Sequence, residues 1–261
     1  EEMDAEFCGV VNRHFPDGER YIRVLMDVNE QDVVVIQNTF PDKKIVELLL
    51  ILQAVKEAGA KTVTCVIPYM GYSRQERIFQ SGEARSAKAI ASVIGGMCDR
   101  VFTINVHTPE ILKFFGCEAN DINGSREVVR YLKGFGPDMV IAPDEGSRDR
   151  CTLAADLLKV PVHVMKKVRI DGRTVETSSG QINVKGSTAV ILDDIISTGG
   201  TIATAANILR DGGAERVFAA CTHGLFIEDA ANRLRVCDDI LSSDTLEGVY
   251  TRFSVAPAIA D

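Results

Sequence analysis

Short runs of nearly all-apolar residues alternate along this chain with longer segments whose apolar residues recur at helical spacing. Strands of parallel sheets are buried on both faces, so the apolar runs predict such strands. Helices are predicted over 45–58, with Gly59 as the C-cap, and over 201–210. A third helix is predicted after Thr108 as N-cap and Pro109 as first residue. This alternation predicts a doubly wound α/β architecture. The predicted strands are 33–36, 62–67, 101–106, 139–142, 162–165, 189–192 and 216–221.

The two halves of the chain resemble each other. "VVVIQNT" (33–39) precedes a predicted helix and "AGAKTVTCVIP", whereas "AVILDDI" (189–195) precedes a predicted helix and "GGAERVFAACT". This correspondence indicates a tandem duplication of one strand–turn–helix–strand unit, although any two such units share a general likeness. The Gly-containing stretch 120–136 is the expected boundary between the two halves.

The stretch "VILDDIISTGGT" (190–201) combines an apolar run, two carboxylates and a Gly-containing turn. Ligands bind at the carboxyl ends of strands in α/β sheets, and helix N-termini attract phosphate. The glycines allow close approach of the backbone, and the acidic pair suits vicinal ribose hydroxyls. The alternative is an ordinary helix start with acidic neighbours. The predicted sugar-phosphate site comprises Asp193, Asp194, Ser197, Thr198, Gly199, Gly200 and Thr201. The first copy has Gln37 and Asn38 in place of the acidic pair, so only the second copy is expected to bind a phosphosugar.

Composition narrows the partners of the protein. A net charge of −8 and the absence of Trp argue against a nucleic-acid surface. The seven cysteines lack metal-ligand spacing, which favours reduced thiols in a cytoplasmic protein over a zinc site. No apolar run is long enough for a membrane span, and no signal peptide is apparent. We therefore expect a cytoplasmic protein that binds neither nucleic acid nor membrane.

Several segments carry a family resemblance. "VILDDIISTGGT" resembles the phosphoribosyl-diphosphate (PRPP) binding motif of type I phosphoribosyltransferases and of ribose-phosphate pyrophosphokinases, the PRPP synthetases. Ordinary phosphoribosyltransferases lack counterparts of the first three segments below, so the chain looks most like the pyrophosphokinases, and their archaeal branch in particular. The segments, in the order of that family, are "RHFPDGERYIRV" (13–24), "PYMGYSRQERIF" (68–79), "NVHTPEILKFFG" (105–116), "APDEGSRDR" (142–150) and "KKVRIDGRTVE" (166–176).

The resemblance implies both a fold and a reaction. The fold would be α/β, with tandem duplicated type I phosphoribosyltransferase-like domains, each a mostly parallel sheet flanked by helices. Residues 1–125 would form the ATP side and residues 126–261 the ribose 5-phosphate side, with the last segment returning to the first domain. ATP would transfer its β,γ-diphosphate to the 1-hydroxyl of ribose 5-phosphate, giving PRPP and AMP. The family also implies Mg2+ and a homo-oligomer, a dimer or larger.

The resemblance also implies roles for single residues. Two residues apart on an extended segment, Lys167 and Arg169 face the same side and match the catalytic pair that stabilises the transferred diphosphate. His107 matches a residue that contacts ATP phosphates and metal, and Asp144 matches the other metal-linked position. The residues implied in ATP binding are Phe15, Asp17, Glu19, Arg74, Gln75 and His107. From the residues alone, "KKVR" is a solvated basic loop, "FPDGE" a plain turn, and a lone histidine structural.

Four departures from the family pattern qualify this expectation. Asn105-Val106-His107 replaces Asp-Leu-His, and Glu76 replaces a usual Asp. Ser147 replaces the second glycine of P-D-x-G-G, which we expect to strain the turn by roughly 1 kcal/mol. The family's first strand is missing before Glu1, which indicates an incomplete or processed N-terminus, or divergence. The alternatives are therefore a catalytically weakened binding or regulatory relative, and a PRPP-consuming phosphoribosyltransferase, against which "RQER" and "FPDGE" argue.

Overall fold

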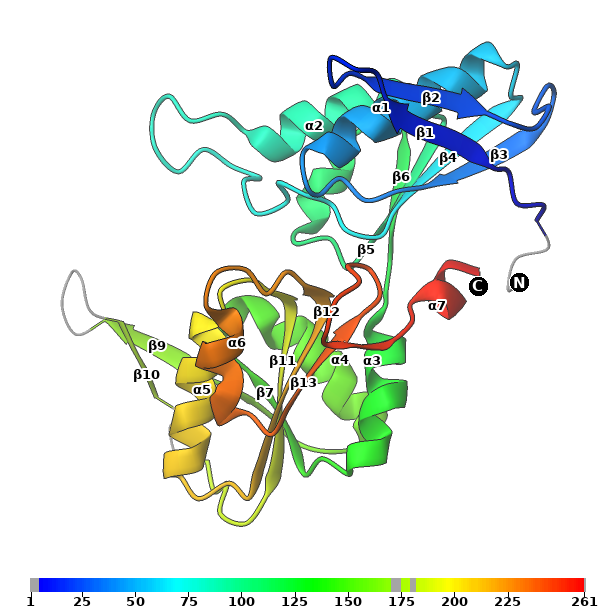
Figure 1. The fold of residues 1–261 in the computed structure, drawn as a ribbon. Helices are drawn as coiled ribbons and strands as arrows, with labels where there is room; N and C mark the ends of the chain where they lie inside the picture. Colours follow the sequence, from blue (N-terminus) through cyan, green and yellow to red (C-terminus); the bar gives the residue numbers. More distant parts are fainter. Residues whose placement is uncertain (1–4, 170–174, 179–181, 261) are drawn as a thin grey trace. The chain divides into compact units, whose positions relative to one another are not determined.

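The chain folds into two compact units that divide between Ile122 and Asn123 (Figure 1). The computed structural model describes residues 5–169, 175–178 and 182–260, and for 166–169 and 175–178 it describes the backbone alone. Within these residues, no helix is long and apolar enough to cross a bilayer. All seven cysteines are unpaired thiols, as expected.

Unit 1 is a parallel four-stranded sheet, in the order β3-β4-β5-β6, with an antiparallel hairpin, β1-β2, beside it. Its core lies on one face of the sheet. Leu48 and Leu52 of the first helix and Ile94 of the second pack there against Cys65 and Ile67 of β4. The elements are β1 (Val10–His14), β2 (Arg20–Val24), β3 (Asp32–Ile36), α1 (Lys43–Glu57), β4 (Thr62–Ile67), α2 (Ser86–Gly95), β5 (Arg100–Ile104), the 3-10 helix η1 (Pro109–Phe114) and β6 (Glu118–Ile122).

Unit 2 is a parallel six-stranded sheet in the order β14-β13-β12-β11-β7-β8, with a separate hairpin of β9 and β10. The helices are α3 (Ser125–Leu132), α4 (Arg148–Leu158), α5 (Gly200–Asp211), α6 (Ala230–Arg233) and α7 (Ala256–Ala260), with 3-10 turns η2 (Lys133–Phe135), η3 (Glu145–Ser147) and η4 (Leu234–Val236). The strands are β7 (Met139–Ala142), β8 (Val162–Val164), β9 (Lys166–Arg169), β10 (Val175–Ser178), β11 (Thr188–Ile196), β12 (Arg216–Gly224), β13 (Asp239–Ser243) and β14 (Thr251–Phe253).

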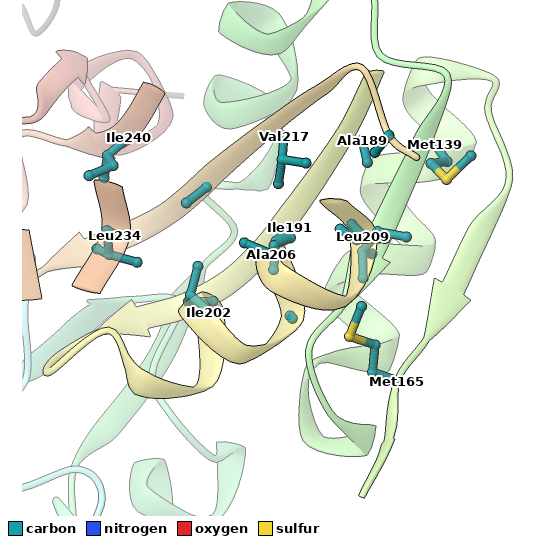
Figure 2. Packing of buried hydrophobic residues seen from close by; sticks show 14 of the residues in the cluster. Met139, Met165, Ala189, Ile191, Ile202, Ala206, Leu209, Val217, Leu234 and Ile240 are labelled. Carbon is teal, nitrogen blue, oxygen red and sulfur yellow. The ribbon is translucent and has the colours of Figure 1, made fainter. Parts of the chain in front are cut away.

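Both faces of the unit 2 sheet are covered, which is why its strands are apolar throughout (Figure 1). On one face, α5 places Ile202, Ala206 and Leu209 against Ile191 and Val217 (Figure 2). On the other face, α3 and α4 pack against the alternate residues of the same strands, including Val190 and Leu192. The middle of β11 is thus packed between helices on both faces of the sheet.

The helices that follow β3 and β11 end in the same way, which supports the predicted duplication. After α1, Gly59 N–H donates to Lys56 O (3.0 Å) and Ala60 N–H to Val55 O (3.2 Å). After α5, Gly213 N–H donates to Arg210 O (2.9 Å) and Ala214 N–H to Leu209 O (3.0 Å). Each glycine has a positive φ, 86° and 88° respectively. This is the hydrogen-bond pattern of the Schellman motif, in which a left-handed residue closes a helix.

Four local predictions were wrong in their bounds or type. The strand expected at 189–192 runs on to Ile196, and the helix expected from Thr201 begins at Gly200, so the acidic pair lies inside β11. The helix after Thr108 is a 3-10 helix, and Thr108 occupies the N-cap position without a side-chain cap. The strand expected at 101–106 ends at Ile104, because Asn105 adopts φ 44° and turns the chain.

Candidate functional site

The candidate site of unit 2 lies where the strand order reverses. From β7 the chain passes to β8 on one side of the sheet, and then to β11 on the other side. Such a switch point opens a crevice at the carboxyl ends of the two central strands, which is where open α/β sheets bind ligands. Asp144 follows β7 and Asp193 lies near the end of β11, so the topology brings both carboxylates to this edge.

The turn from Ser197 to Gly199 connects β11 to α5 and forms a cradle of backbone amides. Its carbonyl groups are tied to the protein: Ile227 N–H donates to Ser197 O (3.1 Å), and Arg233 Nη1 donates to Thr198 O (3.0 Å). Ala203 N–H donates to Gly199 O (2.8 Å). In a trans peptide the N–H points opposite to the C=O. The N–H groups that follow these carbonyls, those of residues 198–200, therefore point away from the groups that bind the carbonyls. No acceptor among the described residues is paired with these N–H groups. An anion could therefore accept hydrogen bonds from these N–H groups.

The two glycines of this turn serve different purposes. Gly199 adopts φ 75°, and a Cβ added there would lie 3.0 Å from Cγ of Leu234, so the fold itself requires glycine. A Cβ added at Gly200 would meet no described atom within 4 Å, although Gly200 is the first residue of α5. The fold does not need glycine at position 200, and the open space beside its amide is the room that a phosphate would occupy.

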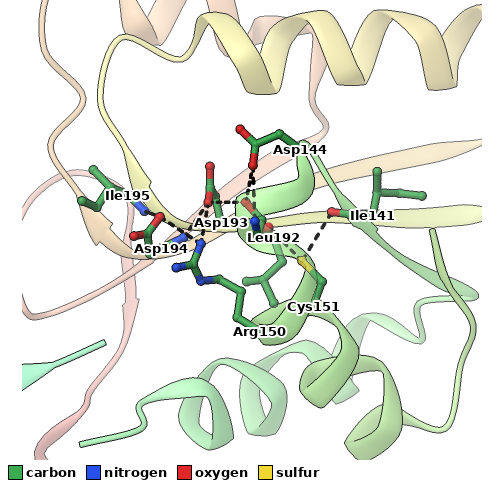
Figure 3. A network of polar contacts seen from close by, with 9 residues as sticks. Ile141, Asp144, Arg150, Cys151, Leu192, Asp193, Asp194 and Ile195 are labelled. Carbon is green, nitrogen blue, oxygen red and sulfur yellow. Dashed lines mark hydrogen bonds and ion pairs between the residues drawn. The ribbon is translucent and has the colours of Figure 1, made fainter. Parts of the chain in front are cut away.

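A single arginine holds the acidic pair together (Figure 3). Arg150 Nη1 of α4 lies 3.1 Å from Asp193 Oδ1 and 3.2 Å from Asp194 Oδ1. The side chain of Asp193 is 17% exposed and that of Asp194 only 4%. Burial and the adjacent charge of Asp194 raise the pKa of Asp193 to about 7, although Ser147 and Arg150 act to lower it. Asp193 is thus the more accessible carboxylate, and it changes charge near neutral pH.

The turn after β7 is not strained by its serine, contrary to our expectation. Ser147 has φ −90° and ψ −5°, an ordinary right-handed conformation that needs no glycine. Asp144 caps this turn: its Oδ1 accepts from Ser147 N–H at 3.3 Å and from Ser147 Oγ at 3.2 Å. The Ser147 hydroxyl also reaches Asp193 Oδ1, at 2.7 Å. We expected the serine side chain to destabilise this turn. It instead connects two carboxylates of the site.

In unit 1, His107 lies in a turn after β5 that a carboxylate anchors. Asp121 Oδ1 of β6 accepts from Val106 N–H (2.9 Å) and from Thr103 Oγ1 (2.6 Å). Asn105 tolerates its left-handed conformation because asparagine is among the few residues that adopt it readily. Asn105 therefore has a conformational role. Its left-handed backbone forms the turn that places His107 just after the carboxyl end of β5.

Arg74 and Gln75 lie in the loop that follows β4, at the same sheet edge as the His107 turn. Arg74 is exposed, and Gln75 Nε2 donates to Arg77 O and to Glu83 Oε2, both at 3.3 Å. The loop packs closely on Thr39, since a Cβ at Gly71 would lie 2.7 Å from Thr39 O. The loop after β4 is thus fixed at its base, with Arg74 directed to solvent.

Phe15, Asp17 and Glu19 form the turn of the β1-β2 hairpin. Asp17 Oδ1 accepts from Glu19 N–H (2.9 Å), as expected for a plain Pro-Asp-Gly turn. Phe15 is 43% exposed and meets the Tyr21 ring edge-on, with 5.6 Å between the ring centroids. The turn therefore presents an aromatic face and a carboxylate, Glu19, on a projecting hairpin.

The β1-β2 hairpin is tied to helix α1 through a buried carboxylate. Glu47 of α1 is 3% exposed, and it pairs with Arg20 of β2 (3.4 Å) and Lys44 (2.8 Å). Gln37 Nε2 also donates to Glu47, at 2.6 Å. Burial acts to raise the pKa of Glu47, but hydrogen bonds from Lys44 and Asn12 and the nearby charges hold it below its usual range. Gln37, the first-copy counterpart of Asp193, is thus part of an internal network.

Lys167 and Arg169 lie on β9, whose partner in the hairpin is β10. In the backbone register Lys167 faces Thr177, and Arg169 faces Val175. Both lie in an extended strand, two positions apart. Their side chains lie outside the described part of the chain, as do residues 170–174 of the segment "KKVRIDGRTVE".

Sequence reasoning missed two contributors to the unit 2 site, Arg150 and the hydroxyl of Ser147. They are three residues apart, at the start of α4, and residues at that spacing share one helix face. The helix follows the turn that carries Asp144, so this spacing places both side chains near that turn, but it does not record that α4 lies against β11.

Comparisons with known proteins match both units. Residues 1–97 match the family model for the N-terminal domain of ribose phosphate pyrophosphokinase, and residues 123–254 match the model for the phosphoribosyl transferase domain. A ribose-phosphate pyrophosphokinase from Methanopyrus kandleri is 39% identical over 267 aligned positions, covering 100% of this chain and 92% of that protein. The chain belongs to the ribose-phosphate pyrophosphokinase family. The predicted resemblance is thereby confirmed.

Other members of the ribose-phosphate pyrophosphokinase family give the same picture. The protein from Methanosarcina mazei is 40% identical over 251 positions, which cover 95% of this chain and 84% of that one. The crystal structure of phosphoribosylpyrophosphate synthetase from Mycobacterium smegmatis superimposes with a TM-score of 0.86, at 28% identity, over 99% of this chain and 90% of that chain. The expected architecture, with two phosphoribosyltransferase-type domains built on parallel sheets, is confirmed.

Proposed function

We propose that this protein transfers the β,γ-diphosphate of ATP to the 1-hydroxyl of ribose 5-phosphate, yielding PRPP and AMP. One observation carries the proposal: the amide cradle after β11 lies beside an acidic pair at the topological switch point of unit 2. The family membership and the relatives named ribose-phosphate pyrophosphokinase support the same reaction.

Unit 2 would hold the sugar phosphate. The amides and hydroxyls from Ser197 to Thr201 would donate to the 5-phosphate, at the positive end of α5. Asp193 and Asp194 would accept from the ribose hydroxyls, which fixes the ring and leaves the 1-hydroxyl as the nucleophile. The 1-hydroxyl oxygen attacks the β-phosphorus and loses its proton to solvent, the bond between the β-phosphorus and the α–β bridging oxygen breaks, and AMP leaves with that oxygen.

Unit 1 would hold ATP. His107 and Arg74, at the carboxyl ends of β5 and β4, are suited to the phosphates, with Gln75 beside them. The hairpin turn with Phe15, Asp17 and Glu19 would contact adenine, by stacking and by accepting from its amino group. Lys167 and Arg169 would stabilise the charge that develops on the α–β bridge as that bond breaks.

A metal ion is expected for chemistry on a triphosphate, and we propose Mg2+, with Asp144 as a candidate contact in unit 2 and His107 as a candidate contact in unit 1. Within the described residues, no group of three or more His, Cys, Asp or Glu side chains is arranged to hold a metal by itself. That fits an ion which prefers oxygen ligands, keeps several waters and relies on substrate phosphates. When bound, the ion would neutralise charge on the phosphates, while Asp144 holds it at the end of β7.

We further propose that the protein is a cytoplasmic homo-oligomer, a dimer or larger. Its seven unpaired cysteines suit a reducing compartment. On β3 of unit 1, Val34 and Ile36 are 43% and 52% exposed, so this strand keeps apolar surface that a second copy could cover. Light scattering after size-exclusion chromatography tests the assembly, and a single-chain mass would refute it.

The decisive assay incubates the protein with ATP, ribose 5-phosphate and Mg2+ and separates the products. We expect AMP and PRPP in equal amounts, and no product without ribose 5-phosphate. Binding of both substrates without product would instead indicate a catalytically weakened relative. Among the departures that favoured that reading, the serine at 147 is unstrained and the asparagine at 105 adopts a conformation that suits it.

A further inference from the structure

We propose that Ser147 is a positioning residue for the pentose site: its hydroxyl orients the carboxylate of Asp193 toward the sugar. This inference rests on the proposed function, because it assumes that Asp193 accepts from a ribose hydroxyl. The serine is 1% exposed and lies between Asp144 and Asp193, to both of which it is hydrogen-bonded.

Proton counting assigns the two hydrogen bonds. A serine hydroxyl has one proton, so it donates fully to one acceptor at a time. Asp193 Oδ1, at 2.7 Å, is closer than Asp144 Oδ1, at 3.2 Å, and Asp144 also receives the Ser147 amide. The backbone of Ser147 therefore serves Asp144, and its side chain serves Asp193. A glycine or alanine here would keep the first link and lose the second.

The orientation of Asp193 needs such a donor. The terminal torsion of an aspartate is broad, so rotamer preference alone does not fix its carboxylate plane. Asp193 accepts from Ser147 Oγ, Arg150 Nη1 (3.1 Å) and Asp194 N–H (2.9 Å), and all three bonds end on Oδ1. Oδ2 receives none of these three bonds and is the oxygen that we assign to the ligand. Ser147 supplies the shortest of the three bonds, and it favours the ionised form that accepts from a sugar hydroxyl.

The test compares Ser147→Ala with Thr152→Ala. Thr152 is a half-buried residue of α4, the helix that follows Ser147. Its hydroxyl donates to Arg148 O (2.9 Å), and among the described residues it is not bonded to a site carboxylate. Calorimetric titration with ribose 5-phosphate should show about a tenfold weaker affinity for Ser147→Ala, the loss expected for one hydrogen bond to a charged group. The affinity of Ser147→Ala for ATP should stay within about twofold of that of the unmodified protein. Both affinities of Thr152→Ala, for ATP and for ribose 5-phosphate, should also stay within about twofold, the scatter expected for a substitution that is independent of the site.

A double-mutant cycle separates positioning from a general structural effect. In an Asp193→Ala background, adding Ser147→Ala should cost no further affinity, because the carboxylate that it orients is gone. Equal losses in both backgrounds, or an unchanged affinity of the single variant, would overturn the inference. If Asp193→Ala binds the sugar phosphate too weakly to measure, the same cycle is read from urea unfolding at pH 8. Additive unfolding free energies would then overturn it.

The outcomes also separate this inference from the proposed function. If the unmodified protein makes PRPP but the double-mutant cycle is additive, the proposed function stands and Ser147 has no positioning role in it. An unmodified protein that binds ribose 5-phosphate with the expected coupling but gives no product would keep the positioning role and refute the catalytic proposal. Absence of ribose 5-phosphate binding to the unmodified protein would refute both.

Discussion

Adding one methyl group at position 200 should separate ligand binding from stability. In Gly200→Ala, the new Cβ enters space in which no described atom lies within 4 Å, apart from the neighbouring residues and the backbone of α5 itself. A phosphate in that space would lose at least one charge-assisted hydrogen bond, typically worth about 1.5–3 kcal/mol, so the Kd for ribose 5-phosphate should rise roughly 10- to 100-fold. The position is helical, where alanine typically stabilises by about 0.4–1 kcal/mol, so the melting temperature should hold or rise by a few degrees.

Gly199→Ala is the matched control, because it places the same methyl group one residue earlier. There the chain has φ 75°, and the Cβ would lie 3.0 Å from Leu234 Cγ. We expect a loss of roughly 1–3 kcal/mol of unfolding free energy from the disfavoured backbone conformation. Calorimetric titration and differential scanning calorimetry measure both variants. If Gly200→Ala binds ribose 5-phosphate as tightly as the unmodified protein, the cradle does not hold the 5-phosphate and the site assignment is wrong.

Three further changes test other parts of the structure. Lys167→Ala should lower kcat about a hundredfold or more, the usual effect of one preorganised donor, and an unchanged kcat would remove it from the mechanism. Glu47→Gln should cost roughly 1–3 kcal/mol in urea unfolding, whereas Glu57→Gln, at an exposed pair on the same helix, should cost little. Because the pKa of Asp193 is raised to about 7, its contribution to stability is present below about pH 4 and is lost as pH rises through about 7. Asp193→Asn should therefore be the more stable form at pH 8, and a stability difference from the unmodified protein that does not change with pH would contradict this.

The parallel strands and their helices could be predicted because their signal is local. Each buried strand reads as a continuous apolar run, and Gly59 closes α1 as its position indicated. The edge strands β3 and β8 were predicted, but the hairpin strands, such as β1 and β9, and the edge strands β6 and β14 were not. They are short or half-exposed and carry charges, so their pairing depends on neighbours distant in the sequence.

The site was predictable as far as its motif and no further. The phosphate turn was readable because glycines, hydroxyls and acidic residues occur together within one short segment. The contribution of Arg150 depends on α4 lying against β11, a packing relation across more than forty residues that no local pattern records. The prediction of strain at Ser147 was also wrong. It rested on the family pattern, which has glycine at this position, but the backbone there is right-handed and needs no glycine.

The matching helix ends after α1 and α5 bear on how such a protein could have arisen. Both copies keep the same glycine, the same pair of closing hydrogen bonds and the same entry into the next strand. They differ at the residues that leave the preceding strand, where one copy carries amides tied into an internal network and the other carries carboxylates. After duplication of an ancestral gene, substitutions near the carboxyl ends of the strands could therefore change the ligand chemistry, while the turns that follow the helices continued to stabilise the fold.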